Sequence, residues 1–295
     1  MNKMVAKLLD GKELSKEIRN KLKQRVTVLK EKGITPKLAV ILVGEDEASK
    51  VYVHNKHRAA EKIGIETIDI KLAQDITEKE LLLQVRKYNE DDSIHGILVQ
   101  LPLPKQISEE KVTCAIAPEK DVDGFHPVNI GHLFMNNPHS LPCTPHGIMK
   151  FFEKYELPIA GKNVVIVGRS NIVGRPMAAM MLNNDATVTI THSKTKNLSE
   201  FTRQADILIA AVGHAAFIKK NDVKPGAVVI DVGMNRNDKG KLVGDVEQKG
   251  VSEVASYITP VPGGVGPMTI AMLMEQTVKF AERGVQIGNR KVSNG

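Results

Sequence analysis

The feature that most constrains the fold is a series of short, continuous apolar runs rich in β-branched residues. Runs of this length are typical of strands that are buried on both faces of a parallel sheet. Helix-like stretches separate them, and such alternation indicates an α/β fold. The predicted strands are Leu38–Val43, Ile94–Val99, Asn163–Val167, Thr187–Thr191, Ile207–Ala211 and Ala227–Asp231. The predicted helices are Leu14–Lys32, Ser49–Ile63, Glu78–Asn89, Arg175–Asn183, Leu198–Gln204 and Pro267–Arg283.

The length of 295 residues predicts two domains. We place their boundary at the Pro- and Gly-rich stretch Leu141–Gly147, after which a new series of strands and helices begins. Residues 1–146 form the first predicted domain and 147–267 the second, and the last helix, 268–287, is expected to return to the first. We expect two α/β domains around a cleft, the second a Rossmann-type, doubly wound, mostly parallel sheet.

Composition limits the classes of function. Two cysteines, Cys114 and Cys143, favour a reducing compartment over a disulfide scaffold. No leader-like segment begins the chain, and the apolar runs are far shorter than the ~20 residues of a membrane helix. We therefore expect a cytoplasmic protein that does not bind membranes. The net charge of +7 is spread along the chain without interleaved aromatic residues, which favours anionic small molecules over nucleic acid.

A glycine-rich turn predicts a nucleotide site. The segment Gly168–Gly174 lies between a predicted strand and a predicted helix, where backbone N–H groups can bind phosphate. It departs from the usual G-x-G-x-x-G pattern because Ser170 replaces the second glycine. Gly213 and Gly233, each just beyond a later strand, would form the floor of the same site, although each could be an ordinary turn.

The end of the following strand distinguishes NADP from NAD. NAD sites usually carry a carboxylate there for the ribose 2′-hydroxyl, but residues 191–195 contain none. Instead, Ser193 and Lys194 follow the strand, and Arg169 lies in the glycine-rich turn, where its guanidinium suits phosphate oxygens. This pattern favours NADP. The alternative is that these are solvated loop residues.

Tyr52 and Lys56 are four residues apart in a predicted helix and therefore share one face. The pair resembles a general acid/base pair or the Tyr-x-x-x-Lys of short-chain dehydrogenases. The order along the chain excludes the second interpretation. In short-chain dehydrogenases the motif follows the cofactor-binding half, whereas here the motif precedes that half.

Three further segments are candidates for a site. Gln100 ends a predicted strand and either faces a site or is an exposed loop amide. Asp121 and Asp123 are two apart, either as functional carboxylates or as an acidic turn. Residues 260–267, rich in Pro and Gly, form either a loop around a ligand or an interdomain connection. We expect no metal, because His and Cys lack ligand spacing and two aspartates are too few for a metal cage.

Together, these segments resemble the bifunctional methylenetetrahydrofolate dehydrogenase/cyclohydrolase family. The resemblance spans nearly the whole chain in family order. The matching stretches are Tyr52–Lys56, Gly96–Pro104, Pro118–Phe125, Gly168–Pro176 and Pro262–Thr269. It implies that NADP takes a hydride from 5,10-methylenetetrahydrofolate, and that water then opens the 5,10-methenyl cation to 10-formyltetrahydrofolate. A monofunctional NADP-dependent dehydrogenase is the nearest alternative, and a non-catalytic NADP-binding protein is a more remote one.

The resemblance also implies roles for individual residues. Lys56 transfers protons in the hydrolysis, Gln100 holds Lys56 by a hydrogen bond, and Tyr52 stacks on the aminobenzoyl ring. Asp123, rather than Asp121, accepts hydrogen bonds from the pterin. The remaining substrate residues implied are Pro262, Gly263, Gly264 and Val265. The cofactor residues implied are Gly168, Arg169, Ser170, Val173, Gly174, His192, Ser193, Gly213, Met234, by its backbone, and Thr269.

The family also implies a homodimer, and a folate substrate that can carry a glutamate tail. Because the chain lacks the long synthetase extension of trifunctional relatives, we expect no ligase activity. Lys56, Gln100 and Asp123 are all present, which favours both activities over dehydrogenase activity alone.

Overall fold

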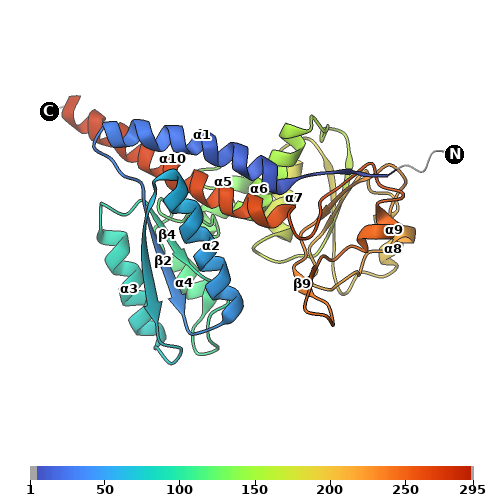
Figure 1. Ribbon diagram of the computed structural model, residues 1–295, viewed down its shortest axis with the longest axis horizontal. Coiled ribbons are helices and arrows are strands. Elements are labelled where there is room, and N and C mark those ends of the chain that lie inside the picture. Colours follow the sequence, from blue (N-terminus) through green and yellow to red (C-terminus); the bar gives the residue numbers. More distant parts are fainter. Residues whose placement is uncertain (1–4, 294–295) are drawn as a thin grey trace. The chain divides into compact units, whose positions relative to one another are not determined.

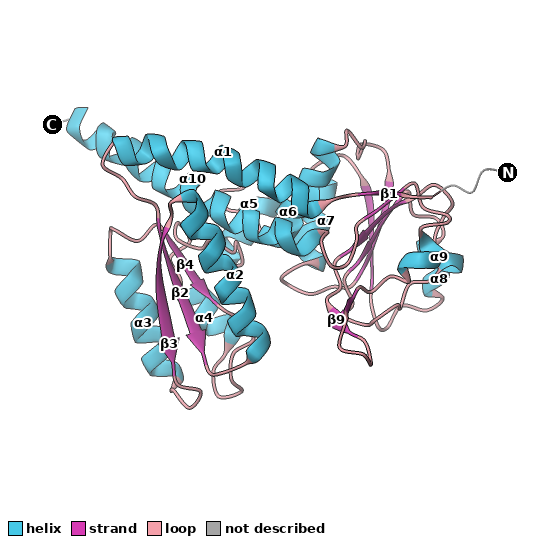
Figure 2. Cartoon of the chain, in the orientation of Figure 1, coloured by secondary structure: helices cyan, strands magenta, loops and turns pink. Residues whose placement is uncertain are grey.

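The computed structural model describes residues 5–293, apart from the side chains of Ala48 and residues 285–293. The chain divides into two compact units. The six-stranded unit comprises Met1–Ser15 and Thr144–Thr269, and the three-stranded unit comprises Lys16–Cys143 and Ile270–Gly295. Each unit is built on a parallel sheet with helices packed against it (Figure 2), which confirms the predicted α/β class.

The three-stranded unit has a sheet in the order β3-β2-β4. Its strands are β2 (Lys37–Val43), β3 (Glu66–Leu72) and β4 (Gly96–Val99). Alternate residues of β2 enter two separate cores, because side chains along a strand point to opposite faces. Figure 1 shows α2 and α3 flanking these strands. The helices that lie wholly or mostly in this unit are α1 (Gly11–Glu31), α2 (Glu47–Ile63), α3 (Glu78–Glu90), α4 (Glu109–Ala115), α5 (Pro127–Phe134) and α10 (Val265–Ser293).

Local signals fix the ends of α2, the helix that carries Tyr52 and Lys56. The Asp46 carboxylate accepts a hydrogen bond from Ser49 N at 2.7 Å, which satisfies a free N–H group of the first turn. Gly64 ends the helix at φ +87°, a conformation that glycine adopts without steric penalty. These caps fix where the helix begins and ends, and Tyr52 and Lys56, four residues apart within it, lie about one turn apart.

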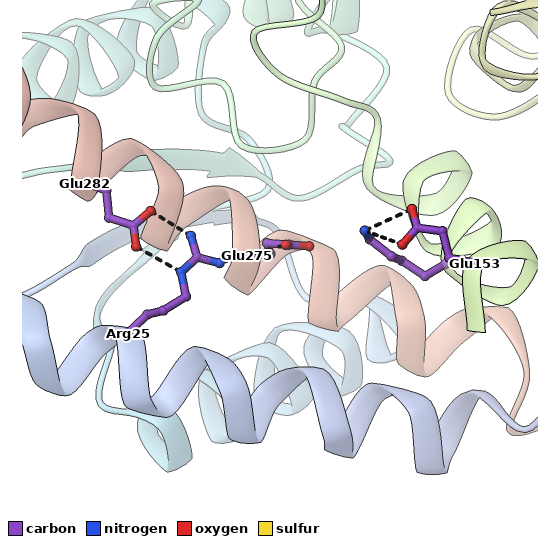
Figure 3. Close-up of polar contacts among 5 residues, drawn as sticks. Arg25, Glu153, Glu275 and Glu282 are labelled. Atoms are coloured by element: carbon purple, nitrogen blue, oxygen red, sulfur yellow. Dashed lines mark hydrogen bonds and ion pairs between the residues drawn. The ribbon is translucent and has the colours of Figure 1, made fainter. Parts of the chain in front are cut away.

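Within the three-stranded unit, α1 and α10 are joined by an ion pair (Figure 3). Arg25 donates from Nε and Nη2 to the two carboxylate oxygens of Glu282 at 2.9 and 2.7 Å. Arg25 Nη1 lies 3.9 Å from Glu275 Oε1, so both carboxylates of α10 face the same guanidinium. A bidentate arginine contact fixes geometry as well as charge.

The six-stranded unit has an all-parallel sheet in the order β1-β11-β8-β7-β5-β6. From β5 the chain moves outward to β6 and then returns to β7 on the other side of β5. This reversal is the topological switch point at which doubly wound sheets bind ligands. The strands are β1 (Lys7–Leu8), β5 (Asn163–Val167), β6 (Thr187–Thr191), β7 (Ile207–Ala210), β8 (Val228–Asp231) and β11 (Tyr257–Ile258).

Helices cover this sheet, and a small antiparallel pair lies apart from it. One face carries a core of alternate residues of β5, β7 and β8 together with Val251 of α9 and Leu198 of α8. The helices are α6 (Cys143–Lys154), α7 (Gly174–Leu182), α8 (Leu198–Thr202), a 3₁₀ turn at Lys220–Asp222 and α9 (Gln248–Val251). The antiparallel pair is β9 (Asn235–Arg236) with β10 (Leu242–Val243).

The predicted strands agree with the structure to within two residues at each end, but some elements were missed. β3 was missed because Glu66, Asp69 and Lys71 interrupt its apolar pattern. The boundary predicted at Leu141–Gly147 includes the beginning of α6, and the compact units divide between Cys143 and Thr144. The first fifteen residues, which we placed in the first domain, group with the six-stranded unit, because β1 pairs with β11. None of the helices within residues 5–293 has the length and apolar character of a membrane span.

Candidate active site

Lys56 and Gln100 are joined directly in the three-stranded unit. Lys56 Nζ, on α2, donates to Gln100 Oε1 at 3.0 Å, just beyond the end of β4. Gln100 Nε2 in turn donates to the carbonyl of Leu101 at 2.5 Å, which turns the amide oxygen toward the lysine. Lys56 is only 8% exposed. The lysine is therefore held in one position by a neutral partner, and Gln100 is not an exposed loop amide.

The two aspartates of the Asp121–Gly124 turn have different environments. Asp121 is buried, and its carboxylate accepts hydrogen bonds from Gly124 N at 3.0 Å, His126 N at 2.8 Å and Asn129 Nδ2 at 2.9 Å. Asp123 is half-buried, and within residues 5–293 the structure shows no hydrogen bond to its carboxylate. Asp121 thus holds the turn together, whereas the acceptor capacity of Asp123 is available to a ligand.

The pKa of the Asp123 carboxyl lies closer to neutral pH than that of an ordinary aspartate. Burial raises the pKa of Asp123 to about 6, although the nearby Lys56 charge lowers it and Asp121 raises it further. At neutral pH the carboxylate is mostly ionised. Cys143, whose Sγ donates to the Val122 carbonyl at 3.1 Å, has a pKa raised well above its usual value by burial and remains a thiol. Cys143 is therefore not a proton-transfer group at neutral pH.

Tyr52 lies one turn before Lys56 on α2 and is half-buried. Burial raises the pKa of its phenol, so the ring stays neutral at physiological pH. A neutral aromatic ring on the same helical face as a buried lysine can contact an aromatic ligand without adding charge.

The glycine-rich turn of the six-stranded unit requires its glycines. Gly168 has φ +125°, and a Cβ there would lie 2.2 Å from the carbonyl oxygen of Ala211. A Cβ on Gly174 would lie 2.2 Å from the carbonyl oxygen of Gly168. Ser170 Oγ accepts hydrogen bonds from Val173 N at 3.2 Å and Gly174 N at 3.4 Å. Its hydroxyl therefore stabilises the turn through local hydrogen bonds. The turn follows β5 beside the switch point, where phosphate binding is expected.

The end of β6 presents polar and cationic side chains. His192 Nδ1 accepts from Lys194 N at 3.2 Å, and Thr195 N donates to the His192 carbonyl at 2.8 Å, which forms a tight turn. Ser193 and Lys194 are exposed on it, as is Arg169 in the glycine-rich turn. Arg175 Nε donates to the Arg169 carbonyl at 3.3 Å and so steadies that segment.

The turns after β7 and β8 are organised by two buried aspartates that sequence reasoning missed. Asp245 accepts hydrogen bonds from the N–H groups of Val212, Gly213 and His214, and Asp231 accepts from Gly233 N. The available signal was the presence of a glycine close to each aspartate, in Asp231–Gly233 and in Gly244–Asp245.

The Pro- and Gly-rich loop is more enclosed than its composition indicates. The Gly263 carbonyl accepts from Gly11 N and Lys12 N at 3.0 and 3.1 Å, and Gly263, Gly264 and Val265 are buried while Pro262 is exposed. Val265 already belongs to α10. The hydroxyl of Thr269 lies 3.0 Å from that of Thr144.

The predicted residues fall into two sets. Tyr52, Lys56, Gln100 and Asp123 lie in the three-stranded unit, and the predicted cofactor residues and the 262–265 loop lie in the six-stranded unit. Met234 is 47% exposed, and its sulfur would lie 3.8 Å from a Cβ on Gly266. Among the described residues, no three His, Cys, Asp or Glu side chains gather as a metal site.

Two family models match the chain. Residues 9–123 match the catalytic domain of tetrahydrofolate dehydrogenase/cyclohydrolase, and residues 142–285 match its NAD(P)-binding domain. The chain belongs to the tetrahydrofolate dehydrogenase/cyclohydrolase family. The resemblance inferred from the motifs is therefore confirmed.

Relatives within the tetrahydrofolate dehydrogenase/cyclohydrolase family are similar over nearly their full length. The bifunctional protein FolD of Ligilactobacillus salivarius is 67% identical over 96% of this chain and 99% of its own. The crystal structure of the bifunctional FolD enzyme from Campylobacter jejuni matches with a TM-score of 0.93 and 53% identity over 94% and 99% of the two chains. The Trypanosoma brucei enzyme, solved with NADP and an inhibitor, matches with a TM-score of 0.92 and 38% identity over 95% and 99%.

The six-stranded unit fits the NADP of this family. The close approaches of Gly168 and Gly174 leave room for backbone N–H groups but not for side chains. Residues 191–195 include the exposed Ser193 and Lys194 and no carboxylate. Arg169, which follows Gly168 in the sequence, is also exposed. A carboxylate-free, cationic strand end suits a ribose 2′-phosphate.

Proposed function

We propose that Lys56 is the proton-transferring residue of a bifunctional enzyme, with Gln100 and Asp123 as its positioning and substrate-binding partners. The enzyme uses NADP to oxidise 5,10-methylenetetrahydrofolate to 5,10-methenyltetrahydrofolate, and it hydrolyses that cation to 10-formyltetrahydrofolate. The observation that carries the assignment is the buried Lys56–Gln100 hydrogen bond. The unengaged Asp123 carboxylate near the lysine supports it.

The chemistry of hydrolysis defines what Lys56 must do. The positive charge of the methenyl substrate favours neutral lysine, which removes a proton from water as the water oxygen bonds to the methenyl carbon. Lys56 then returns that proton to N5 as the bond from this carbon to N5 breaks, and the hydroxyl proton leaves to yield the formyl group. Gln100 accepts one lysine N–H and so directs the remaining Nζ valences toward the substrate.

Substrate binding falls to the residues around the lysine. The Asp123 carboxylate accepts hydrogen bonds from the amino edge of the pterin, and Tyr52 stacks on the aminobenzoyl ring. In the six-stranded unit, Pro262–Val265 is the segment proposed to bind substrate. Asp121 is a support for the turn and not a ligand, because its lone pairs are engaged within the protein.

NADP, when bound, supplies the hydride acceptor. The glycine-rich turn, with Val173 and Ser170, would receive the phosphates, and Arg169 with Ser193 and His192 would hold the 2′-phosphate. Gly213, Met234 and Thr269 would line the remainder of the cofactor.

We also propose that the chain acts as a cytoplasmic homodimer, that it accepts folates with a glutamate tail, and that it binds neither nucleic acid nor membranes. The three-stranded unit would supply most of the folate contacts, and the six-stranded unit would bind NADP. Light scattering at micromolar concentration tests the homodimer, with twice the 32.3 kDa chain mass expected.

A coupled assay tests the function. The purified chain is supplied with methylenetetrahydrofolate and NADP or NAD, and NADPH and methenyltetrahydrofolate are followed by absorbance. We expect NADPH to form and methenyltetrahydrofolate added alone to be hydrolysed. If methenyltetrahydrofolate accumulates and persists, the chain is a monofunctional dehydrogenase. If neither coenzyme is reduced, the assignment as a dehydrogenase fails.

A further inference from the structure

Two buried carboxylates lie near the carboxyl ends of β7 and β8 in the six-stranded unit. Asp231 ends β8 and is 1% exposed, and Asp245, which follows β10, is fully buried. Within the described residues, neither carboxylate is paired with a lysine or arginine. Burying an ionised carboxylate without a cation is unfavourable unless hydrogen bonds replace its hydration. Both carboxylates instead accept several hydrogen bonds within the protein, and these bonds take the place of a cation.

Asp245 holds the turn after β7. Its Oδ2 accepts from Val212 N at 2.6 Å and Gly213 N at 3.0 Å, and its Oδ1 accepts from His214 N at 3.0 Å. Oδ1 also accepts from Asn235 Nδ2 at 2.9 Å, which links this turn to the segment after β8. One side chain thus positions two of the turns at the carboxyl edge of the sheet.

Asp231 holds Asp245 in turn. Its Oδ1 accepts from Gly233 N at 2.9 Å and from Asp245 N at 2.8 Å, and its Oδ2 accepts from Val246 N at 3.0 Å. The first bond shapes the turn that leads to Met234, and the other two fix the backbone on which Asp245 is mounted. Asp231 therefore positions Asp245, and Asp245 positions the turn after β7.

The backbone around the pair is shaped to admit it. A Cβ on Gly233 would lie 2.3 Å from Asp245 Oδ1, and a Cβ on Gly244 would lie 1.7 Å from Asp231 Oδ2. Burial raises the pKa of Asp231 to about 6, its backbone N–H donors lower it, and Asp245 raises it. Each carboxylate occupies space that a Cβ on the neighbouring glycine would fill.

We propose that Asp231 and Asp245 form a positioning pair that preorganises the NADP-binding turns after β7 and β8. The proposal rests on the proposed function, since it takes Gly213 and Met234 as cofactor residues. Neither aspartate is proposed to touch NADP. Preorganised turns bind a ligand without first losing conformational entropy. Loosening these turns should therefore lower the affinity for NADP and leave the rate of methenyltetrahydrofolate hydrolysis unchanged.

The test uses the full-length protein with Asp245→Asn. An asparagine of the same shape turns either an NH₂ group or only one acceptor toward the converging N–H groups, which leaves donors unpaired. We expect the amides of Val212–His214 to exchange with deuterium at least ten-fold faster in the cofactor-free protein. We expect the calorimetric Kd for NADP to rise at least ten-fold, while methenyltetrahydrofolate hydrolysis without NADP stays within about two-fold of wild type.

The matched control is Asp206→Asn in the same unit. Asp206 precedes β7 at the opposite edge of the sheet, where it binds Lys224 Nζ at 2.7 Å and Asn163 N at 2.9 Å. Its loss should not change NADP affinity. If Asp245→Asn binds NADP as wild type does, or if Asp206→Asn weakens NADP equally, the pair has no specific positioning role.

A milder variant covers the case in which Asp245→Asn does not fold. Asn235→Ala removes one donor to Asp245 and leaves the carboxylate with its backbone partners. We expect a rise of about two- to five-fold in the Kd for NADP, with faster exchange at Val212–His214. Unchanged exchange and unchanged Kd in Asn235→Ala overturn the proposal. If the wild-type protein itself fails to bind NADP, the proposed function fails instead.

Discussion

Lys56 Nζ and Gln100 Oε1 lie 3.0 Å apart, and this contact joins the middle of α2 to the end of β4. It pairs a buried lysine with an uncharged acceptor. A neutral partner orients the amine without stabilising its charged form as a carboxylate would. This is the arrangement expected of a lysine that must lose and regain a proton in each catalytic cycle.

Replacing Gln100 by glutamate tests that choice of partner. In Gln100→Glu, the carboxylate stabilises the ammonium form of Lys56, so we expect methenyltetrahydrofolate hydrolysis to slow by about 10- to 100-fold near neutral pH. The lost rate should recover in part as the pH is raised. The pH profile of kcat measures both effects. Gln24→Glu, on the exposed face of α1, is the matched control, and an unaltered profile in Gln100→Glu would refute the role of Gln100.

We expect the ionised Asp123 carboxylate to lower the stability of the fold while it contributes to folate binding. Its folded pKa of about 6 lies above the ordinary 3.8, so the folded state binds the extra proton, and the resulting stability is lost as the pH rises from about 4 through 6. At pH 8 the ionised group is destabilising. Asp123→Asn should therefore raise the free energy of unfolding at pH 8 by about 1–3 kcal/mol, and by less near pH 5.

The same variant should bind folate poorly, because an amide is uncharged, keeps only one acceptor oxygen and presents an NH₂ donor in place of the other. We expect KM for methylenetetrahydrofolate to rise by at least about ten-fold. Denaturant titrations at the two pH values and steady-state kinetics measure these effects. A variant that is less stable than wild type at pH 8, with an unchanged KM, would show that Asp123 is structural.

For Asp121, in the same turn, we expect the opposite effect of an asparagine substitution on stability. Asp121→Asn disturbs hydrogen bonds from Gly124, His126 and Asn129, so we expect a loss of stability of about 1–3 kcal/mol. Denaturant unfolding near pH 7 measures it. Because the turn carries Asp123, KM for the folate should also rise, but less than in Asp123→Asn. Unchanged stability in Asp121→Asn would contradict the structural role.

Arg169 tests cofactor selection. Arg169→Ala removes an exposed guanidinium from the glycine-rich turn and should weaken NADP by at least about ten-fold, while NAD is little affected. Calorimetric titration with each coenzyme separates the two. Arg203→Ala, an exposed arginine at the end of α8, is the control. Equal losses for NADP and NAD in Arg169→Ala would remove Arg169 from the 2′-phosphate site.

How much the sequence reveals depends on whether a signal is local. β2 and β5 were predictable because continuous apolar runs mark strands buried on both faces. β1 and β11 were not, because each has two residues and forms only when Lys7 and Leu8 pair with Tyr257 and Ile258, far along the chain. Charged residues concealed β3, the edge strand beside β2.

The same distinction applies to the candidate site. The spacing of Tyr52 and Lys56 predicts a shared helical face, and the structure places them on α2. Spacing alone could not separate Asp121 from Asp123, because the difference depends on which carboxylate the folded turn engages. The Asp231–Asp245 pair was missed because its structural role depends on backbone N–H groups from three segments that only the fold brings together.

The most direct test of the central claim is hydrolysis by Lys56→Met, a variant that keeps the length of the side chain but cannot carry a proton. With methenyltetrahydrofolate as substrate, we expect hydrolysis to fall by at least about 100-fold, the range that general acid–base catalysis contributes. The Kd for NADP should stay within about two-fold, and Lys62→Met, an exposed lysine of α2, should behave as wild type. Hydrolysis at the wild-type rate in Lys56→Met would contradict the account.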